Sequence, residues 1–112
     1  MFLDKELREA IKPQRNEILD ILRENNLEGV AVGDTEITLV SEFTKDFYYE
    51  VILETYYDGS WVITEREEES SAPFVSSTDL NLHYTECSAQ DVVDALVKEM
   101  SKASLSRDVN IF

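Results

Sequence analysis

The chain has 112 residues, 43% of them hydrophobic and 10% aromatic, which suffices for one packed domain and excludes a disordered chain. Twenty-four acidic and ten basic residues give a formal net charge of −14, a sign that disfavours direct binding to nucleic acid or to an anionic membrane. With one cysteine and one histidine, the sequence offers neither an internal disulfide nor the usual nitrogen-and-sulfur zinc site.

The amino-terminal segment does not have the pattern of a secretory signal, because charge appears at Asp4 and no continuous apolar run follows. The longest uninterrupted aliphatic runs, such as 51–53, are far too short to span a membrane. The lone Cys87 is compatible with a reducing compartment. We therefore expect a cytoplasmic protein that does not bind membranes.

The first segment has helical periodicity, with Asp4 as the expected N-cap. Its apolar stripe consists of Leu7, Ile11, Ile18 and Leu22. Pro13 interrupts the stripe, and proline removes a hydrogen bond from a helix interior. We therefore predict a short helical turn through Ile11 and a main helix from Pro13 to Asn25, ended by Asn25, Asn26 and Gly29.

Residues 29–67 alternate between apolar and polar positions, which predicts a four-strand antiparallel meander. A two-residue Gly33-Asp34 turn is expected to pair Val32 with Thr35. In the next hairpin, the alternation of apolar and polar residues continues on both sides of a short polar loop. The first two hairpins are therefore predicted to keep an unbroken register.

The loop 44–46 in that second hairpin places Phe47 opposite Phe43 and Val51 opposite Leu39. These pairs put the aliphatic side chains of both strands on one face, toward the predicted core.

The third hairpin admits two registers, and a one-residue slip would move every side chain to the opposite face. A loop that ends in a bulge at Gly59 pairs Thr55 with Trp61 and Glu50 with Arg66. This register buries more apolar surface than the register set by a two-residue Asp-Gly turn. It also places the opposite charges of Glu50 and Arg66 across from each other. We therefore predict the bulged hairpin.

Residues 68–77 combine an acidic run, serines and a proline, and are predicted to form a loop. A fifth strand is expected over 78–86, with Leu80, Leu82 and Tyr84 on one face. Ser88 and Asp91 have the spacing of a capping box before the last helix. That helix presents an apolar side formed by Val92, Val93, Leu96, Val97 and Met100.

The predicted fold class is therefore α+β: an antiparallel five-stranded meander-type sheet with the N-terminal and C-terminal helices packed on one face, in the order α-β-β-β-β-β-α. Residues 1–104 are expected to form one domain, and residues 105–112 a C-terminal tail.

Negative charge is concentrated in the meander, because residues 27–69 hold twelve acidic and only two basic residues. On the predicted register, the sheet face opposite the core has an aliphatic centre, flanking tyrosines and a rim of glutamates, as protein-binding faces do. Its residues are Glu36, Val40, Glu42, Tyr48, Glu50, Ile52, Glu54, Tyr56 and Val62. An ordinary solvated sheet face has a similar pattern.

Three classes of function remain. The first is a non-enzymatic interaction protein, such as an inhibitor or immunity-type protein, whose acidic face binds a basic protein partner. The second is a structural or chaperone-like homodimer that uses the same face. The third is an enzyme or small-ligand binder with a pocket between sheet and helices, near Tyr49, Trp61 and Tyr84.

Catalytic chemistry is disfavoured. His83 and Cys87 are four residues apart on or just past one strand, about 13 Å at the usual strand rise, too far for a catalytic pair. The carboxylates of Glu36, Glu54 and Asp34 could contact a divalent cation, but no calcium-loop motif surrounds them. We therefore expect no catalytic residues, no cofactor and no bound metal.

Overall fold

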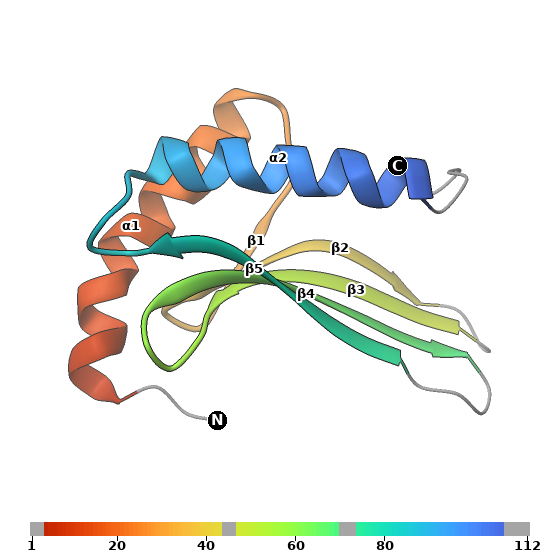
Figure 1. Ribbon diagram of the computed structural model, residues 1–112, viewed down its shortest axis with the longest axis horizontal. Coiled ribbons are helices and arrows are strands. Elements are labelled where there is room, and N and C mark those ends of the chain that lie inside the picture. The colour runs from red at the N-terminus through yellow and green to blue at the C-terminus, as the bar shows by residue number, and fades with distance from the viewer. Residues whose placement is uncertain (1–3, 44–46, 70–73, 107–112) are drawn as a thin grey trace.

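The computed structural model describes residues 4–43, 47–69 and 74–106. Five strands form one antiparallel sheet in the order β1-β2-β3-β4-β5, and two helices lie on one face of it (Figure 1). The elements are α1 Lys5–Glu24, β1 Val30–Val32, β2 Glu36–Phe43, β3 Phe47–Thr55, β4 Ser60–Glu69, β5 Phe74–His83 and α2 Ala89–Ser106. The predicted α+β class and element order are confirmed.

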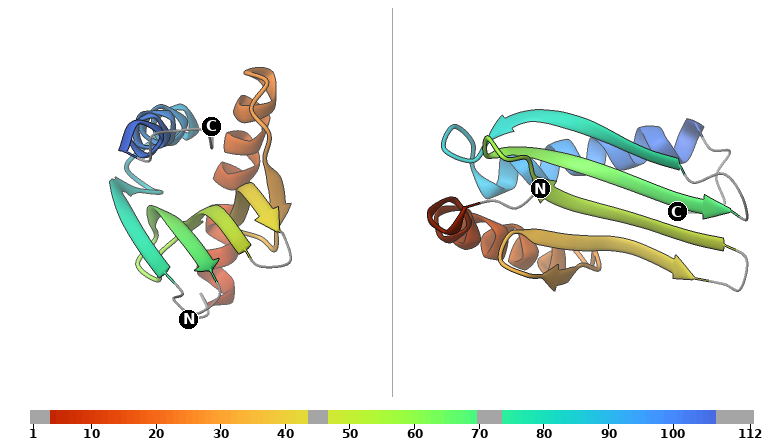
Figure 2. Two further views of the ribbon diagram at one scale, coloured as in Figure 1. Left: turned by 90° about the vertical axis from the view of Figure 1, so that its right-hand side faces the viewer. Right: turned by 90° about the horizontal axis from the view of Figure 1, so that it is seen from below.

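The two helices divide the covered face between them, with α1 nearer β2 and α2 nearer β5 (Figure 2). Core residues come from both helices and from alternate positions of the strands. The largest fully buried side chains are Trp61, Tyr49, Ile11, Ile18, Leu22, Ile37, Leu53, Leu96 and Val92. Among residues 4–43, 47–69 and 74–106, no helix lies on the opposite side of the sheet, and we call that side the outer face.

Helix α1 is continuous through Pro13, so the predicted interruption is wrong. Ile11 and Ile18 are both fully buried on either side of the proline. Burying these two side chains on one stripe favours a single helix, because each contributes about 1.5–3 kcal/mol of hydrophobic stabilisation against about 3 kcal/mol for an interior proline. The N-cap is confirmed, since the Leu7 backbone N–H donates to Asp4 Oδ1 at 2.9 Å.

Capping residues act at the other helix ends as the sequence predicts. Asn26 has a φ of 59° after α1, and the Leu27 N–H donates to the Leu22 carbonyl at 2.8 Å. Before α2, the Ser88 N–H donates to Asp91 Oδ2 at 2.9 Å, and the Asp91 N–H donates to Ser88 Oγ at 3.1 Å. This reciprocal pair is the predicted capping box.

The predicted β3–β4 hairpin is confirmed. Thr55 pairs with Trp61 and Glu50 pairs with Arg66. Gly59 has a φ of 92°, and a Cβ at this position would lie 2.7 Å from Tyr84 Cδ1. Glycine is therefore required both by the backbone of the bulge and by the close approach of Tyr84, just after β5.

The β1–β2 register differs from the prediction by one residue. Val32 pairs with Glu36, so the connection is a three-residue loop of Gly33, Asp34 and Thr35. Thr35 is buried rather than paired, and the shift leaves Val30 64% exposed. A one-residue slip reverses the face of each side chain, which is why both aliphatic residues of β1 point away from the core.

The β2–β3 register is also broken. Ile37 pairs with Leu53 as predicted, but Val40 pairs with Val51 because a bulge falls between Thr38 and Val40. The prediction of an unbroken register is therefore wrong beyond Thr38.

The segment predicted as a loop over 68–77 is largely strand. β4 extends to Glu69 and β5 begins at Phe74, and extending the ladder pairs backbone groups that a loop would leave to solvent. Residues 70–73 lie outside the described residues. At the other end of β5, the predicted inward face is confirmed, because Leu80, Leu82 and Tyr84 pack against the core.

Helix α2 runs to Ser106, past the expected domain boundary at 104, and the rest of the predicted tail lies outside the described residues. Within the part of the chain that the structure describes, neither helix is long and apolar enough to cross a membrane.

Candidate functional site

Strand β3 supplies the middle of the outer face. Tyr49, Val51 and Leu53 are buried in the core, so the residues that alternate with them point outward. Four of the predicted site residues are these outward positions: Tyr48, Glu50, Ile52 and Glu54, all half-buried. Glu36 lies half-buried at the start of β2, and Tyr56 follows β3 and is 52% exposed.

The predicted bare aliphatic centre of this face is wrong at Val62, which is only 8% exposed. Val62 lies on β4 and pairs with Glu54 on one side and Asp79 on the other. Flanking side chains cover it because an inner strand has neighbours on both edges. The outer face is therefore more polar at its surface than the sequence predicts.

The bulge in β2 changes the assignment of Val40 and Glu42. On the predicted register they lie opposite the outward residues Glu50 and Tyr48, but the backbone instead pairs Val40 with Val51 and Glu42 with Tyr49. The side chains of both residues lie outside the described part of the structure, so the outer face is defined here without them.

Hydrogen bonds orient the acidic side chains of the outer face. The Tyr48 hydroxyl donates to the Glu50 carboxylate. Thr64 Oγ1 donates to Glu54 Oε1 at 2.9 Å and lies 3.3 Å from Ser77 Oγ. Carboxylates held in this way present their charge in fixed positions along the strands.

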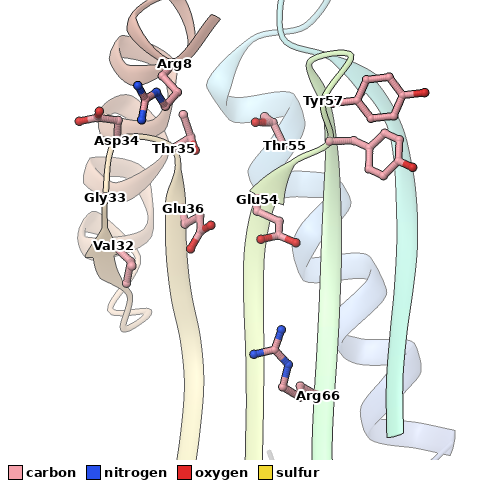
Figure 3. A pocket seen from close by; sticks show the side chains of 11 residues that line it. Arg8, Val32, Gly33, Asp34, Thr35, Glu36, Glu54, Thr55, Tyr57 and Arg66 are labelled. Atoms are coloured by element: carbon pink, nitrogen blue, oxygen red, sulfur yellow. The ribbon is translucent and has the colours of Figure 1, made fainter. Parts of the chain in front are cut away.

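A pocket of about 560 Å³ opens at the end of this face, where β2 begins and β3 ends (Figure 3). Its lining comes from the start of α1, the β1–β2 loop, the end of β3 and the middle of β4. The lining residues are Arg8, Val32, Gly33, Asp34, Thr35, Glu36, Glu54, Thr55, Tyr56, Tyr57 and Arg66. Glu36, Glu54 and Tyr56 are among the site residues predicted from the sequence, but the pocket itself is not.

Negative charge is in excess around Glu36. Partial burial raises the pKa of its carboxyl group, and the nearby carboxylates of Glu54 and Glu50 raise it further. Arg66 acts in the opposite direction and lowers this pKa. Figure 3 shows Glu36 and Glu54 side by side on neighbouring strands, with the Arg66 guanidinium extending toward them from β4. Arg66 therefore offsets only part of the charge of the three glutamates.

At the other end of the pocket, charges are more evenly matched. Asp34 forms an ion pair with Lys12 of α1, whose Nζ lies 3.6 Å from Asp34 Oδ1. Arg8, also from α1, lies beside Asp34 (Figure 3). The excess of carboxylates is therefore confined to the Glu36–Glu54 end.

Thr55 places an unusual polar atom in the pocket wall. The residue is only 9% exposed, and its Oγ1 has no hydrogen-bond partner among the described residues. Its hydroxyl points toward the β2 side of the pocket (Figure 3). Thr55 pairs with Trp61, so its side chain lies on the core side of β3, on the face opposite Glu54. A buried hydroxyl without a partner costs about 1–3 kcal/mol of stability.

Arg15 positions the β1–β2 wall of the pocket, a role that was not predicted from the sequence. The side chain is 4% exposed, and its Nη1 donates to the carbonyls of Val32 at 3.4 Å, Gly33 at 3.1 Å and Glu36 at 3.0 Å. The available signal is its position on the buried stripe of α1, four residues after Ile11, where a charged residue needs internal partners.

The pKa shift of Glu36 predicts a pH-dependent gain from Glu36→Gln. The pKa of Glu36 is higher in the folded state than in the unfolded state, so the folded state binds more protons at pH values between the two. Stability therefore falls as the pH rises through this range. The neutral variant avoids this loss. It should be more stable than the wild type at pH 7 by about 0.5 kcal/mol, a value limited by solvent screening.

Urea unfolding of both proteins at pH 7 and at about pH 4 measures the effect. The difference should shrink at the lower pH, where Glu36 of the wild type is itself protonated. Glu17→Gln, at an exposed position of α1, is the control. A variant less stable at pH 7, or a gain that persists in acid, would contradict the electrostatic origin.

The other candidate chemistries have structural explanations. His83 stabilises the β3–β4 turn, because its Nε2 donates to the Asp58 carbonyl at 2.7 Å. Thr85 Oγ1 lies 2.7 Å from its Nδ1. Burial raises the pKa of the Cys87 thiol, and Asp91 raises it further, so the reactive thiolate is disfavoured. Within the described residues, no three Asp, Glu, His or Cys side chains are arranged to hold a metal ion.

The pocket also differs from the one considered between sheet and helices. Tyr49, Trp61 and Tyr84 do not line it. Trp61 is fully buried, and its Nε1 donates to Gln14 Oε1 at 2.6 Å. This aromatic group therefore belongs to the core rather than to the pocket.

Compared with known proteins, the chain matches no family model, and no curated protein and no solved structure shows significant similarity to it. Function is therefore inferred from the geometry and charge of the chain itself.

Proposed function

We propose that this protein is a non-enzymatic interaction protein whose outer sheet face binds a basic protein partner in the cytoplasm. The observation that supports the proposal most strongly is the incompletely neutralised group of Glu36, Glu50 and Glu54 on the outer face. A cationic surface placed against these carboxylates would restore the favourable interactions that partial burial removes.

The distribution of charge supports the same partner class. The formal net charge is −14, and most of the excess lies in residues 27–69. Such a field attracts basic proteins over several ångströms and speeds their association at low ionic strength. An inhibitor or immunity-type protein that occupies a basic cleft is the more specific form of this proposal.

A fluorescent octalysine peptide tests the charge preference directly. The triple variant Glu36→Gln, Glu50→Gln, Glu54→Gln removes three charges while keeping side-chain size. Its affinity for the peptide should fall about tenfold, which corresponds to roughly 0.5 kcal/mol for each exposed ion pair. Fluorescence anisotropy at low ionic strength measures the binding, and circular dichroism checks the fold of each variant.

The matched control changes the same number of charges on a helix. Glu17→Gln, Asp20→Gln and Glu24→Gln are all exposed positions of α1, and this triple variant should bind octalysine within about twofold of the wild type. Equal loss in both variants would show that only net charge matters, and would reject a dedicated binding face.

A further inference from the structure

We propose that two copies of this chain pair through strand β5 and form a dimer with one continuous antiparallel sheet. Among the described residues, β5 pairs only with β4, so its other edge is open. Both views in Figure 2 show β5 at the margin of the sheet. The inference is independent of the proposed function, because the outer face is available to a basic partner in a monomer and in such a dimer.

The register of the sheet determines which backbone groups of β5 point to the open edge. In an antiparallel ladder, the N–H and C=O groups of alternate residues point to the same neighbouring strand. The Tyr56 N–H donates to the Ser60 carbonyl at 2.8 Å, so the even-numbered residues of β4 direct their backbone groups to β3. The odd-numbered residues of β4 then bond to the even-numbered residues of β5. This pattern leaves the backbone groups of Val75, Ser77 and Asp79 at the open edge.

The open edge ends at Asp79. Asn81 has a φ of 59°, and its N–H donates to Asp79 Oδ1 at 2.7 Å. The pairing with β4 is irregular in the same place, because the register shifts between Ser60 and Val62. A second strand can therefore extend the sheet along residues 75–79 but not beyond them.

One register satisfies the whole open edge with a second copy. If Ser77 lies opposite Ser77 of the second copy, Val75 lies opposite Asp79 of that copy, and each of these pairs exchanges two backbone hydrogen bonds. A shift by two residues would leave Val75 or Asp79 of each copy without a partner. The edge is therefore self-complementary about a two-fold axis at Ser77, as a closed dimer requires.

The distribution of charge favours a second copy as the occupant of this edge. The chain has a formal net charge of −14, but residues 74–85 include only one acidic residue, Asp79. In the register centred on Ser77, each Asp79 faces Val75, and the two aspartates lie about 14 Å apart along the strands. This separation exceeds the screening length of about 8 Å at physiological salt. A basic partner would find little negative charge here.

The side chains of the β5 edge also permit close approach. Ser77 and Thr78 are exposed and Ser76 is half-buried. Residues 74–83 contain neither lysine nor proline, the residues that commonly block pairing at an edge strand. In the proposed register, Ser76 of one copy faces Thr78 of the other, and small hydroxyl side chains pair favourably across antiparallel strands.

The edge at β1 is less suitable for pairing. This strand has only three residues, Val30–Val32, and the acidic residues Glu28 and Asp34 flank it in the sequence. Two copies joined there would bring these carboxylates together. Since pairing through β5 uses that edge of both copies, the assembly is complete with two subunits.

Sedimentation equilibrium of the full-length chain tests for the dimer, at concentrations from about 5 to 500 µM and in about 0.15 M salt. We expect a Kd of about 10–100 µM, because an interface formed by one edge strand is at the small end of the range for proteins. A protein that remains monomeric over this whole range would overturn the proposal.

The variant Ser77→Pro tests the backbone pairing. Proline removes an N–H that points to the open edge and not to β4, a position at which edge strands tolerate proline. The dimer should weaken at least about tenfold, because both hydrogen bonds across the two-fold axis are lost. Ser77→Ala keeps the N–H and is the control, with an expected Kd within about threefold of the wild type. Circular dichroism checks the fold of both variants.

A pair of charges at residue 77 tests the symmetric register even if the proline variant fails to fold. Ser77→Glu and Ser77→Lys should each weaken the dimer about threefold to tenfold, because like charges then face each other across the axis. An equimolar mixture of the two variants should bind within about twofold of the wild type, because opposite charges then face each other. Val30→Glu adds the same charge at β1 and should leave the Kd within about twofold of the wild type.

Amide hydrogen exchange at increasing protein concentration shows which strand edge is buried. Exchange should slow at Val75, Ser77 and Asp79 but not at Ser76 and Thr78, whose N–H groups already bond to β4. Equal slowing at all five amides would overturn pairing through the β5 edge. A mixture of the two Ser77 charge variants that associates no better than either alone would also overturn it, as would equal weakening by Val30→Glu and Ser77→Glu.

Discussion

Replacing Arg15 with methionine should lower the free energy of unfolding by about 3 kcal/mol. The guanidinium donates to three backbone carbonyls of the β1–β2 segment and, through Nε, to Asn16 Oδ1 at 3.0 Å. Methionine fills similar space but leaves these partly buried carbonyls without their donor. The cost of unsatisfied carbonyls exceeds the gain from removing one buried charge, because each carbonyl loses a charge-assisted hydrogen bond.

Urea unfolding monitored by circular dichroism measures this loss. Arg23→Met is the matched control, because Arg23 is an exposed residue in the last turn of the same helix and should change stability by less than about 0.5 kcal/mol. The Gly33 amide should also shift in the NMR spectrum of the Arg15 variant. A variant as stable as the Arg23 control would show that Arg15 does not hold the loop.

The second large effect is expected for Gln14→Leu, which should lower the free energy of unfolding by about 2–3 kcal/mol. Gln14 Oε1 accepts from Trp61 Nε1 at 2.6 Å, and its Nε2 donates to the carbonyls of Tyr84 at 3.1 Å and Cys87 at 3.0 Å. One amide thus connects α1, β4 and the β5–α2 connection. Leucine would leave the buried indole N–H and two carbonyls without partners.

Intrinsic fluorescence of Trp61 follows this variant, since the chain has one tryptophan. Gln90→Leu provides the comparison, because Gln90 is exposed on α2 and its side chain bonds to Asp94 of the same helix, at 2.9 Å. Its stability should remain within about 0.5 kcal/mol of the wild type. Similar stabilities for the two leucine variants would rule out a structural role for the Gln14 network.

Local sequence signals predicted those parts of the fold in which two requirements agree. The register of the β3–β4 hairpin could be predicted because only the bulged turn buries Trp61 and also opposes Glu50 to Arg66. The start of α2 could be predicted because the side chains of Ser88 and Asp91 satisfy each other's backbone N–H groups.

The β2 bulge could not be predicted by alternation. Leu39 and Val40 are adjacent aliphatic residues, so the strand keeps an apolar side chain toward the core whether or not one residue is inserted. The same ambiguity affects the β1–β2 turn, where shifting the register exchanges Val30 for Ala31 opposite Ile37. At the β1–β2 turn, the hydrogen bonds from Arg15 to the carbonyls of Val32, Gly33 and Glu36 are long-range contacts that alternation does not reveal.

The candidate site was only partly visible in the sequence for a related reason. Glu36 and Glu54 could be placed opposite each other from strand pairing alone. Thr55 could not be identified, since its missing hydrogen-bond partner is a property of the folded surroundings. Arg15 could be recognised from the sequence, because it is a charged residue on the buried stripe of a helix. This signal identifies the residue that positions the wall of the pocket.

The most direct test of the outer face as the binding surface is an NMR titration of the wild-type protein with unlabelled octalysine. The largest amide shifts should fall on β3 and β4, at Glu50, Ile52, Glu54 and Arg66, and should fade as salt screens the charges. Exposed α1 residues such as Glu17 should remain nearly unchanged. Shifts centred on the helices, or spread evenly over all exposed acidic residues, would contradict a binding surface on the sheet.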